Sequence, residues 1–528
     1  MARADGFSAA DTIELENHGL NLDEAERQFR LFEKSPPHVQ LDRPCTIGDG
    51  IRALSDAEVE AASAEHAEAS HQGRLMKFVP ASGAATRMCQ ALLAERDRAG
   101  SRSREDALQR RAAGDTNAAT VLTFMDAIDR FAFSDHLRAG MAAHGWDTAA
   151  LLRQGDFGKI LDGLFSPEGL NASALPKGLL PFHRYPEGNR TAFEEHLVEA
   201  AETVADRHGT CRVHFTVSPE HEDRFRKLLG EVRDGIERRH DIRLEVGFSI
   251  QKRSTDTVAV DLHNRPFRTD RGTLLFRPGG HGALIENLYD LGGDIVFIKN
   301  IDNVVPDWLR ADTLRWKKIL AGLLVIIQRN IFDHLARLRG RSEPAVVDTA
   351  LRFAREDLGL SVPARFESSG VAEQQQRLIE ALDRPVRVCG VVRNTGEPGG
   401  GPFWVRGRDG SLSLQIVESA EVDPARPEQE AIFRAATHFN PVDLVVGVRN
   451  QRGDRFDLRR FVDSEAVFIA HKSMDGRDLK ALERPGLWNG AMAHWTTVFV
   501  EVPGSTFTPV KTVLDLLGPE HQPRAPHG

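Results

Sequence analysis

The residue best placed for chemistry in this sequence is an aspartate at the end of an apolar run. The stretch from Asp294 to Ile301 (DIVFIKNI) alternates little between apolar and polar residues, which predicts a strand covered on both faces in a parallel sheet. Such sheets bind ligands beyond the carboxyl ends of their strands, and Asp302 stands at that end. A carboxylate there can hold a divalent metal that is also bound by phosphate groups.

Two loops of small residues are suited to binding phosphate through their backbone. The loop Pro278 to Gly282 leads directly into a predicted helix. The loop Ala81 to Ala85 joins a predicted strand, Leu75 to Val79, to a predicted helix, Thr86 to Glu95. Small residues let a ligand approach the main chain, and the free amides of a helix start attract anions. Such loops are also common as plain structure in α/β proteins, so both interpretations stay open.

Strands and helices in the rest of the chain must position these groups. Residues up to about Gln72 have helical periodicity, and the stretches 96–169 and 308–382 are also predicted to be mostly helical. Strand patterns occur at 212–217 and 442–448. Strands that alternate with helices predict an α/β fold.

Composition and charge exclude several classes of protein. The chain has 528 residues, 41% of them hydrophobic and 27% charged, which predicts two or three structural units with an ample core. A formal charge of -9 argues against a nucleic-acid partner. The amino terminus lacks the pattern of a secretory signal, and the longest apolar run, Ile319 to Ile327, is too short to span a bilayer. We therefore expect a cytoplasmic protein without a membrane partner.

The four cysteines support the same compartment. Cys45, Cys89, Cys211 and Cys389 lie far apart and show neither zinc-site nor disulfide spacing. Reduced thiols in a cytoplasm fit this usage.

Two segments around Asp302 resemble a known family. PGGHGALIENL and FIKNIDNV are similar to the glycine-rich segment and the N-x-D-N segment of the UDP-sugar pyrophosphorylases. In that family the aspartate of the second segment is a metal ligand, and the first segment contacts the nucleotide. The resemblance therefore implies that Asp302 binds metal and that Gly280, His281 and Gly282 contact the nucleotide.

The loop in KFVPASGAATRM resembles the signature loop of the nucleotide-diphospho-sugar pyrophosphorylases, usually Gly-Gly-x-Gly-Thr-Arg followed by Met or Leu. Ser82 and Ala85 stand where glycines are usual, and a Cβ at Ala85 disfavours a positive φ. The loop geometry, and hence the base that it accepts, stay open. The residues that match the pattern are Gly83, Thr86, Arg87 and Met88. The nucleotide contacts implied by the loop are Ala81, Ser82, Gly83, Ala84 and Thr86.

Two lysines also stand in segments that resemble this superfamily. Pro176-Lys177 is similar to the Pro-Lys segment of bacterial sugar nucleotidyltransferases, whose lysine contacts phosphate, although here a long insertion separates it from the signature loop. A plain surface lysine stays the alternative. STFTPVKTVLDLL is close to the Phe-x-Pro-Val-Lys-Thr-x-x-Asp-Leu-Leu segment of UDP-glucose pyrophosphorylases, in which the lysine reaches the phosphates. The catalytic residues implied by the resemblance are Arg87, Lys177 and Lys511.

Three further segments resemble parts of the family near the nucleotide and the sugar. LEVGFSIQKRSTDTVAVD makes Gln251 a possible nucleotide contact and offers Asp256 or Asp261 as a second metal ligand. SLSLQIVESAEVD makes Glu418 and Glu421 possible sugar or metal contacts, and THFNPVDLVVG places Asn440 near the sugar. Capping and turn roles stay the alternatives for these residues.

The resemblance implies a GT-A or Rossmann-like α/β fold. It has three αβα layers, a mostly parallel central sheet, a helical N-terminal region and helical insertions. The implied division is a helical region at 1–72, a nucleotidyltransferase-like catalytic domain at 73–517 with helical insertions at about 96–169 and 308–382, and a flexible tail at 518–528. The whole is also similar to a bacterial family of this superfamily whose members carry a KFVPASGAATRM-type loop.

The implied reaction joins a nucleoside triphosphate to a sugar-1-phosphate with Mg2+, giving a nucleotide sugar and pyrophosphate. Two alternatives remain. One is a non-catalytic protein of the same fold that binds nucleotide sugars or has a regulatory role, and the other is a glycosyltransferase. Glycosyltransferases typically use an Asp-x-Asp metal pair, and Asn300 stands where the first aspartate of such a pair would be. The sequence specifies neither the base, the sugar nor the oligomeric state.

Overall fold

The computed structural model describes residues 7–34, 38–167, 169–340, 343–361, 366–396 and 399–523. The chain forms two compact units, each assembled from three separate segments. The first contains Met1–Phe78, Ser249–Ile298 and Trp316–Gly504, and the second contains Val79–Phe248, Lys299–Arg315 and Ser505–Gly528. The functional boundaries predicted at residues 72 and 517 stay predictions.

The protein is a mixed α/β structure with a mostly parallel central sheet, as the sequence predicted. Within the first unit the neighbouring strands, in order, are β2 (Thr46–Ile47), β3 (Gly50–Arg52), β19 (Thr496–Glu501), β12 (Val386–Arg393), β16 (Asp443–Gly447), β11 (Ile295–Lys299) and β4 (Leu75–Pro80). The pairs β2 with β3, β3 with β19, β19 with β12 and β11 with β4 are parallel, whereas β12 and β16 are antiparallel. The short strand β15 (His438–Phe439) also pairs with β12.

Strand β11 confirms the apolar run before Asp302 as a buried strand. All five of its residues are buried, and Ile295 to Ile298 pair in register with Leu75 to Phe78 of β4. Of these residues, Phe78, Val296 and Ile298 belong to the large hydrophobic core of the first unit, and Met76 packs against it. Both strands end where the chain passes into the second unit, so β11 delivers Asp302 to the start of a second-unit segment.

The N-terminal region of the first unit differs in part from its prediction. Helices α1 (Ala9–His18), α2 (Leu22–Lys34) and α3 (Asp56–His71) agree with it, but residues 41–52 form strands β1 (Leu41–Pro44), β2 and β3 instead of helix. These strands find partners far along the chain: β1 pairs with β13 (Gly401–Arg406), and β3 pairs with β19. Such long-range pairing overrides local helical periodicity.

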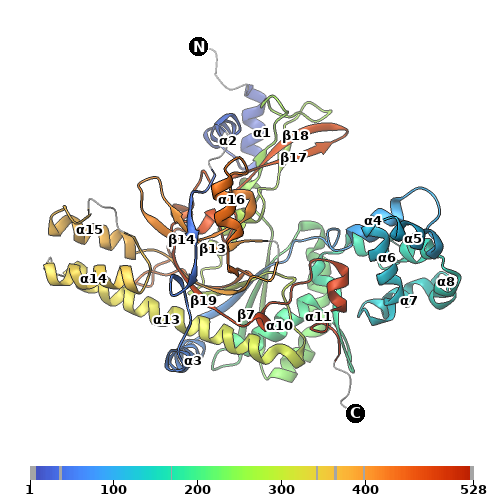
Figure 1. Ribbon diagram of the computed structural model, residues 1–528, viewed down its shortest axis with the longest axis horizontal. Coiled ribbons are helices and arrows are strands. Elements are labelled where there is room, and N and C mark those ends of the chain that lie inside the picture. Colours follow the sequence, from blue (N-terminus) through green and yellow to red (C-terminus); the bar gives the residue numbers. More distant parts are fainter. Residues whose placement is uncertain are drawn as a thin grey trace. The chain divides into compact units, whose positions relative to one another are not determined.

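The remaining first-unit elements surround this sheet or form smaller sheets. Helices α1 and α2 share a hydrophobic cluster with the hairpin of β17 and β18 (Figure 1). The bounds of these elements are β9 (Thr257–Val258), β10 (Phe276–Arg277), α12 (Ile285–Asp290), α14 (Pro344–Glu356), α15 (Val371–Leu382), β14 (Leu412–Val417), α16 (Pro427–Arg434), β17 (Phe468–Met474) and β18 (Arg477–Glu483).

The second unit combines a strand pair with a large helical region. Strands β7 (Thr210–Thr216) and β8 (Arg243–Ser249) are neighbours, and the rings of Phe193, Phe215, Phe225 and Phe248 pack together in its core. The other elements are α4 (Gln90–Asp97), α5 (Arg104–Ala112), α6 (Thr116–Asp126), α7 (Ser134–Ala143), α8 (Thr148–Gln154), α9 (Phe157–Phe165), β5 (Pro181–Tyr185), β6 (Gly188–Thr191), α10 (Ala192–Thr203) and α11 (Glu222–His240). Helices α4 to α8 gather in one group (Figure 1, blue to cyan), as predicted for 96–169.

Helix α13 (Arg310–Gly340) is longer than the apolar run on which the sequence prediction rested. By length and composition alone, the stretch Asp307–Gly340 could cross a membrane. Its most apolar window is, however, 61% buried inside the protein. This burial is what a core helix has.

Candidate functional site

The second unit brings together three residues that the sequence placed far apart. Lys177 Nζ donates a hydrogen bond to Asp302 Oδ2 over 3.0 Å, and Lys511 Nζ donates to the same oxygen over 3.2 Å. Lys177 also donates to the backbone carbonyl of Val510 over 2.5 Å. Two cations and one carboxylate, predicted from three separate segments, therefore form one cluster, which we call the Lys–Asp–Lys cluster.

The electrostatics of this cluster keep Asp302 ionised. Burial by itself raises the pKa of this carboxyl, but the charges of Lys177 and Lys511 outweigh burial and hold the pKa below its usual range. Asp302 and Lys177 are buried, whereas the Lys511 side chain is 53% exposed. The exposed lysine is thus the member best able to meet an incoming anion.

Backbone pairings hold each residue of the cluster in place. Lys177 lies at the start of a short 3-10 turn, Lys177–Leu179, and its backbone N–H donates to the carbonyl of Gly83 over 3.0 Å. The N–H of Val510 donates to the carbonyl of Asp302 over 3.0 Å. The signature-like loop and both lysines therefore belong to one hydrogen-bonded framework around Asp302.

The loop Ala81 to Ala85 differs in detail from its prediction. Helix α4 begins at Gln90, four residues later than predicted, and residues 85–89 form turns. The reason is that the backbone of this stretch bonds elsewhere: Ala85 N–H donates to Leu175, and the carbonyl of Met88 accepts from Val513. Loop residues Ser82, Gly83, Ala84, Thr86 and Arg87 are exposed.

Ala85 does not disturb the loop. It is buried, and neither it nor Gly83 has a positive φ. The Cβ that the sequence marked as unfavourable at this position therefore causes no strain here. This loop exposes its main chain without the glycine conformation of the family pattern.

Glycines of the two loops are expected to respond differently to an added methyl group. A Cβ on Gly83 would meet nothing within 4 Å, whereas a Cβ on Gly282 would lie 1.9 Å from the carbonyl oxygen of Pro485. Gly282→Ala should lower the free energy of unfolding by about 1–3 kcal/mol or more, and Gly83→Ala should change it by less than about 0.5 kcal/mol.

Urea denaturation of both variants measures these energies, and nucleotide titration of the folded Gly83→Ala protein tests the predicted contact. An equally destabilised Gly83→Ala protein would contradict the open position of this loop.

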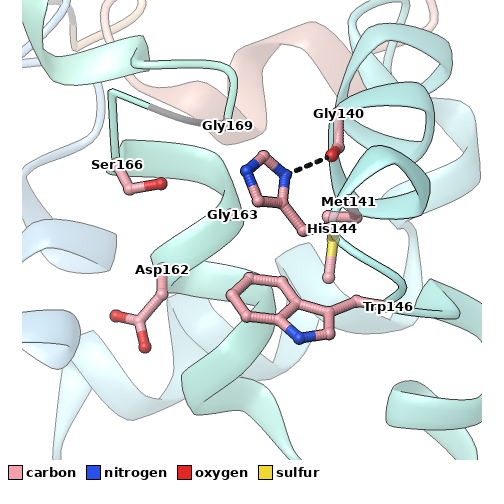
Figure 2. Close-up of a pocket in the computed structure, with 8 residues that line it drawn as sticks. All are labelled: Gly140, Met141, His144, Trp146, Asp162, Gly163, Ser166 and Gly169. Atoms are coloured by element: carbon pink, nitrogen blue, oxygen red, sulfur yellow. Dashed lines mark hydrogen bonds between the residues drawn. The ribbon is translucent and has the colours of Figure 1, made fainter.

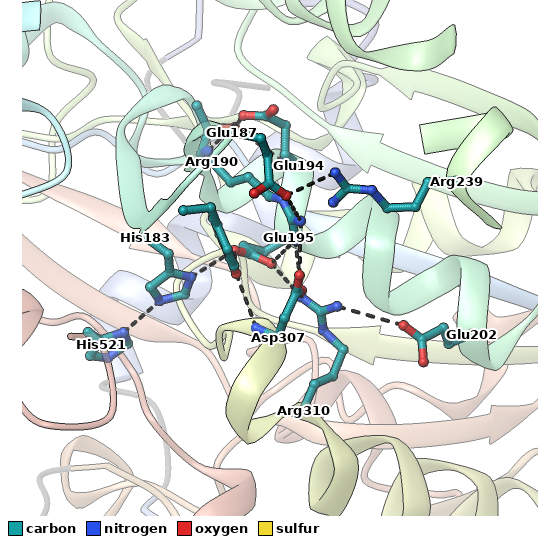
Figure 3. A network of polar contacts seen from close by, with 12 residues as sticks. His183, Glu187, Arg190, Glu194, Glu195, Glu202, Arg239, Asp307, Arg310 and His521 are labelled. Atoms are coloured by element: carbon teal, nitrogen blue, oxygen red, sulfur yellow. Dashed lines mark hydrogen bonds and ion pairs between the residues drawn. The ribbon is translucent and has the colours of Figure 1, made fainter. Parts of the chain in front are cut away.

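A buried network of charged residues ties the segments of the second unit together (Figure 3). Glu195 Oε1 accepts from the Tyr185 hydroxyl (2.6 Å) and lies 2.9 Å from His183 Nδ1. Its Oε2 accepts from Arg310 over 2.7 Å. His183 Nε2 in turn lies 2.9 Å from Nδ1 of His521. The network thus links the segments that follow Lys177, Asp302 and Lys511 along the chain.

Asp307 extends the network. It receives a bidentate ion pair from Arg190, with distances of 2.7 and 2.9 Å, and a contact of 2.5 Å from Arg310. Bidentate arginine pairs fix geometry as well as charge. They hold the turn between Asp302 and helix α13.

His521 lies in the segment from residue 518, for which the sequence predicted a flexible tail, and residues 524–528 of that segment lie outside the described residues. Its side chain is 1% exposed, and its Nε2 has no hydrogen-bond partner among the residues that the structure describes. Burial, together with the neighbouring His183, lowers the pKa of His521 to about 3.

The depressed pKa of His521 predicts a loss of stability in acid. An unfolded histidine titrates near 6.5 and the folded one near 3, so the unfolded chain binds more protons between these values and stability falls as the pH falls through this window. Between pH 7 and pH 5 the free energy of unfolding should fall in both proteins. The fall should be about 1–2 kcal/mol smaller for His521→Asn than for the wild-type protein. Urea denaturation at the two pH values measures this difference, and His263→Asn, at an exposed position, is the control. Parallel pH dependence of wild type and His521→Asn would contradict the prediction.

In the first unit a second group of predicted residues lies together. His281 Nδ1 accepts from the backbone N–H of Leu487 over 3.2 Å, and its ring centroid lies 4.3 Å from that of Trp488. Trp488 Nε1 donates to Glu418 Oε1 over 3.2 Å. Burial lowers the pKa of His281, so its imidazole is neutral. The predicted nucleotide contact and the predicted sugar contact thus share one tryptophan.

Glu421 lies in the same group. Its Oε2 accepts from Asn489 Nδ2 (3.0 Å) and from the backbone of Glu418 (2.8 Å), and burial raises its pKa to about 8. A protonated carboxyl at neutral pH is a poor metal ligand. Of the two roles left open by the sequence for Glu421, a sugar contact fits this environment better than metal binding.

Other predicted residues are occupied by their own chain. The Asn440 side chain donates to the carbonyl of Gly390 and accepts from the N–H of Val442, each over 3.0 Å. Gln251 donates to Asp256, which also lies 2.8 Å from His18. Asp261 pairs with Arg265 over 2.8 Å. These contacts are those of structural residues in turns and ion pairs.

Metal ligands are sparse in this protein. Among the described residues, no group of three or more histidine, cysteine, aspartate or glutamate side chains is arranged to hold a metal ion. Two buried carboxylate oxygens, Oδ1 of Asp302 and Oδ1 of Asp383, have no hydrogen-bond partner among the described residues. The four cysteines are free and buried. Of these two oxygens, the one on Asp302 belongs to the Lys–Asp–Lys cluster.

A hollow of about 280 Å3 lies between helices α7 and α9 of the second unit (Figure 2). The predicted site residues do not line it. A Cβ on Gly169 would lie 1.8 Å from the carbonyl oxygen of Gly163, and one on Gly163 would lie 2.8 Å from Met141 Cγ. The glycines around this hollow therefore serve close packing, and we assign it no ligand.

Sequence reasoning missed the residues that hold the cluster in place. No local signal in the sequence marks these residues, which are Val510, His183, His521 and Arg190, the bidentate partner of Asp307. The helix that carries Glu195 begins with the capping box of Thr191 and Glu194.

Comparison with known proteins adds a family and a set of similar folds. A model of the family described as "Domain of unknown function (DUF4301)" matches residues 8–522. No curated protein matches the sequence.

Two solved structures that resemble the chain are a mutant UDP-glucose pyrophosphorylase from Leishmania major and a UDP-N-acetylglucosamine pyrophosphorylase from Trypanosoma brucei in complex with an inhibitor. Each is 13% identical with a TM-score of 0.46, and each alignment covers 97% of this chain and 79% of the other. The function therefore has to rest on the side chains of the site.

Proposed function

The chain belongs to the family described as Domain of unknown function (DUF4301), and we propose that it is a sugar-1-phosphate nucleotidyltransferase. It joins a nucleoside triphosphate to a sugar-1-phosphate and releases pyrophosphate. The observation that carries this proposal is the Lys–Asp–Lys cluster, in which Lys177 and Lys511 bind one oxygen of Asp302. These residues come from the segments that resemble the metal-binding and phosphate-binding segments of pyrophosphorylases.

The reaction needs alignment and charge neutralisation more than covalent help from the protein. An oxygen of the sugar-1-phosphate forms a bond to the α-phosphorus, and the bond from that phosphorus to the bridging oxygen breaks, so that pyrophosphate leaves with its electron pair. Groups that hold the reactants in line and face the developing charge supply most of the rate. No oxidant or further proton donor is required for this balance.

The cluster is suited to these tasks. In the free protein, Asp302 balances two ammonium groups. A triphosphate can compete for the ammonium of the half-exposed Lys511, while the buried Lys177 stays held by Asp302 and by the carbonyl of Val510. The exposed main chain of Ser82 to Ala84 lies on the same hydrogen-bonded framework. Lys511 thus carries charge toward the phosphates, and Lys177 maintains the geometry.

Asp302 also fits the magnesium ion that the resemblance implies. Its buried Oδ1 lacks a hydrogen-bond partner among the described residues, and Mg2+ in phosphate chemistry is commonly bound by one or two carboxylates together with substrate phosphates. When bound, the ion would neutralise phosphate charge. If a triphosphate draws Lys511 away from Asp302, that carboxylate loses one of its two cations and can bind a metal ion more readily.

A binding protein without catalysis remains the second candidate. The observation that favours it is the ion pairing itself, because both lysines already neutralise Asp302. Such a site can hold an anion without a metal. Product formation separates the two candidates.

The test is a panel assay that crosses the common nucleoside triphosphates with several sugar-1-phosphates, with and without Mg2+. We expect Mg2+-dependent pyrophosphate release with at least one pair. Loss of the Lys511 charge should lower kcat/KM by about a hundredfold. Lys511→Gln is therefore compared with Lys227→Gln, which removes an exposed lysine on α11 of the same unit. Nucleotide-sugar binding without any pyrophosphate release would support the binding protein instead.

A further inference from the structure

A second hollow lies in the first unit, away from every residue that the sequence analysis predicted for a site. It has a volume of about 600 Å3 and is lined by the end of α15, the segment 450–461 that follows β16, and His494 before β19. This volume suits a small organic ligand. The residues that matter for its chemistry are Arg384, Arg455, Arg460, His494, Phe456 and Phe461.

The three arginines of this hollow lack carboxylate partners. Among the described residues, no ion pair involves Arg384, Arg455 or Arg460. Arg384 uses only its Nε, which donates to the backbone carbonyl of Glu380 over 2.9 Å. The guanidinium of Arg455 lies over the ring of Tyr289, 5.5 Å from its centroid. All three arginines therefore line one hollow, and among the described residues no carboxylate lies within ion-pair distance of their guanidinium groups.

The acidic residues around the hollow do not cancel this charge. Asp383 accepts from Arg339 over 2.5 Å, and Asp457 receives a bidentate pair from Arg459 at 2.7 and 3.0 Å. Glu380, the third lining carboxylate, accepts from Gln376 over 2.8 Å, and its charge raises the pKa of Arg384 by less than burial lowers it. Positive charge is therefore in excess.

Arg384 is the least solvated of the three. Burial lowers its pKa, and its charge in turn contributes to lowering that of His494, whose main cause is burial. A partly buried cation without an anion is unfavourable. This arrangement favours a bound anion that supplies the missing partner.

The lining of the hollow also includes apolar side chains. Phe456 and Phe461 pack edge to face with their centroids 5.7 Å apart, and both line the hollow together with Ile379. A ligand that fills the hollow can therefore contact both arginine and aromatic side chains.

We propose that this hollow binds a small organic phosphate, with its phosphate on Arg384, Arg455 and Arg460 and its apolar part against Phe456 and Phe461. Guanidinium groups recognise phosphate through paired, charge-assisted hydrogen bonds. The site lies wholly within the first unit. It goes beyond the proposed reaction and does not depend on it.

The probe for this site is phenyl phosphate, titrated into the full-length protein by calorimetry, with inorganic phosphate and phenol as comparisons. We expect saturable binding of phenyl phosphate in the millimolar range or tighter, weaker binding of inorganic phosphate, and no binding of phenol. Equal affinity for phenyl phosphate and inorganic phosphate would overturn the assignment, as would the absence of saturable binding.

Substitutions in the protein show where phenyl phosphate binds. The double variant Arg384→Gln, Arg460→Gln should weaken binding about tenfold or more, which is about 1.4 kcal/mol, whereas Arg452→Gln on the same segment but outside the hollow should not. Lys511→Gln tests the Lys–Asp–Lys cluster, which also attracts phosphate. Loss of binding in Lys511→Gln with retention in the arginine variant would overturn the proposal.

Hydrogen exchange of the wild-type protein gives an answer even if the double variant does not fold. Phenyl phosphate should slow exchange in the segment 450–461. Unchanged exchange there at saturating phenyl phosphate would count against the site.

Discussion

Asp302→Asn is expected to lower kcat for pyrophosphate release about a thousandfold while the protein stays folded. The asparagine keeps an oxygen that can accept from Lys177, so the geometry of the cluster survives in part. It loses the negative charge that balances Lys177 and Lys511 and that would bind a divalent cation. The expected cost in the free energy of unfolding is therefore modest, about 1–3 kcal/mol.

The matched control for this variant is another buried carboxylate of the same unit. Glu199 receives an ion pair of 2.7 Å from Lys299, and both side chains are at most 3% exposed. Glu199→Gln should destabilise the protein by a similar or larger amount but leave kcat within a few fold. Steady-state assays and urea denaturation of both variants separate the two effects. Equal losses of kcat would mean that the carboxylate acts through folding alone.

Glu195→Gln is expected to lower the free energy of unfolding by about 3–5 kcal/mol, the largest stability change that the structure predicts. The carboxylate is 1% exposed, and its two oxygens serve a tyrosine hydroxyl, a histidine and the guanidinium of Arg310. An amide in its place carries two donors where only acceptors fit. It also removes one carboxylate partner of the buried Arg310, which keeps the half-exposed Asp307 as its other close partner.

A nearby glutamate gives the control for this experiment. Glu187 pairs with Arg239 over 2.9 Å and is 51% exposed, so Glu187→Gln should change stability by less than about 1 kcal/mol. Chemical denaturation measures both variants. A change of less than about 1 kcal/mol for Glu195→Gln would show that the network contributes little net stability, as some buried charge networks do.

Glu195→Gln should also affect turnover, because the network connects the segments that carry the Lys–Asp–Lys cluster. We expect a higher KM for the triphosphate together with a lower kcat at temperatures where the variant is still folded. A structural role confined to the core would leave both constants unchanged in the folded fraction. Measurement below the unfolding transition therefore isolates the positioning effect.

The sequence by itself determined the local elements and the chemistry of the single residues. An uninterrupted apolar run was enough to predict the buried strand β11 and the aspartate at its end. Small residues after β4 predicted an exposed loop. These features depend on hydrophobic periodicity and turn chemistry, which are properties of neighbouring residues.

Local periodicity predicts the wrong structure where distant segments compete for the backbone. Residues 41–52 became strands because β1 and β3 pair with β13 and β19. Helix α4 starts late because the turns before it bond to Leu175 and Val513. His521 is buried because His183 lies against it. In each case the partner lies more than 80 residues away along the sequence, which is close to the length of a whole domain. The contact with that partner outweighs the local preference.

Only the tertiary structure decided which side chains meet. Lys177 and Lys511 lie 125 and 209 positions from Asp302 in the sequence, yet both ammonium groups bind the same oxygen. Spacing along the chain cannot specify such a meeting, because it depends on how strands, turns and helices pack in three dimensions. The unpaired arginines around Phe456 and Phe461 show the same limit: as single residues they are ordinary surface cations, and only the fold collects them around one hollow.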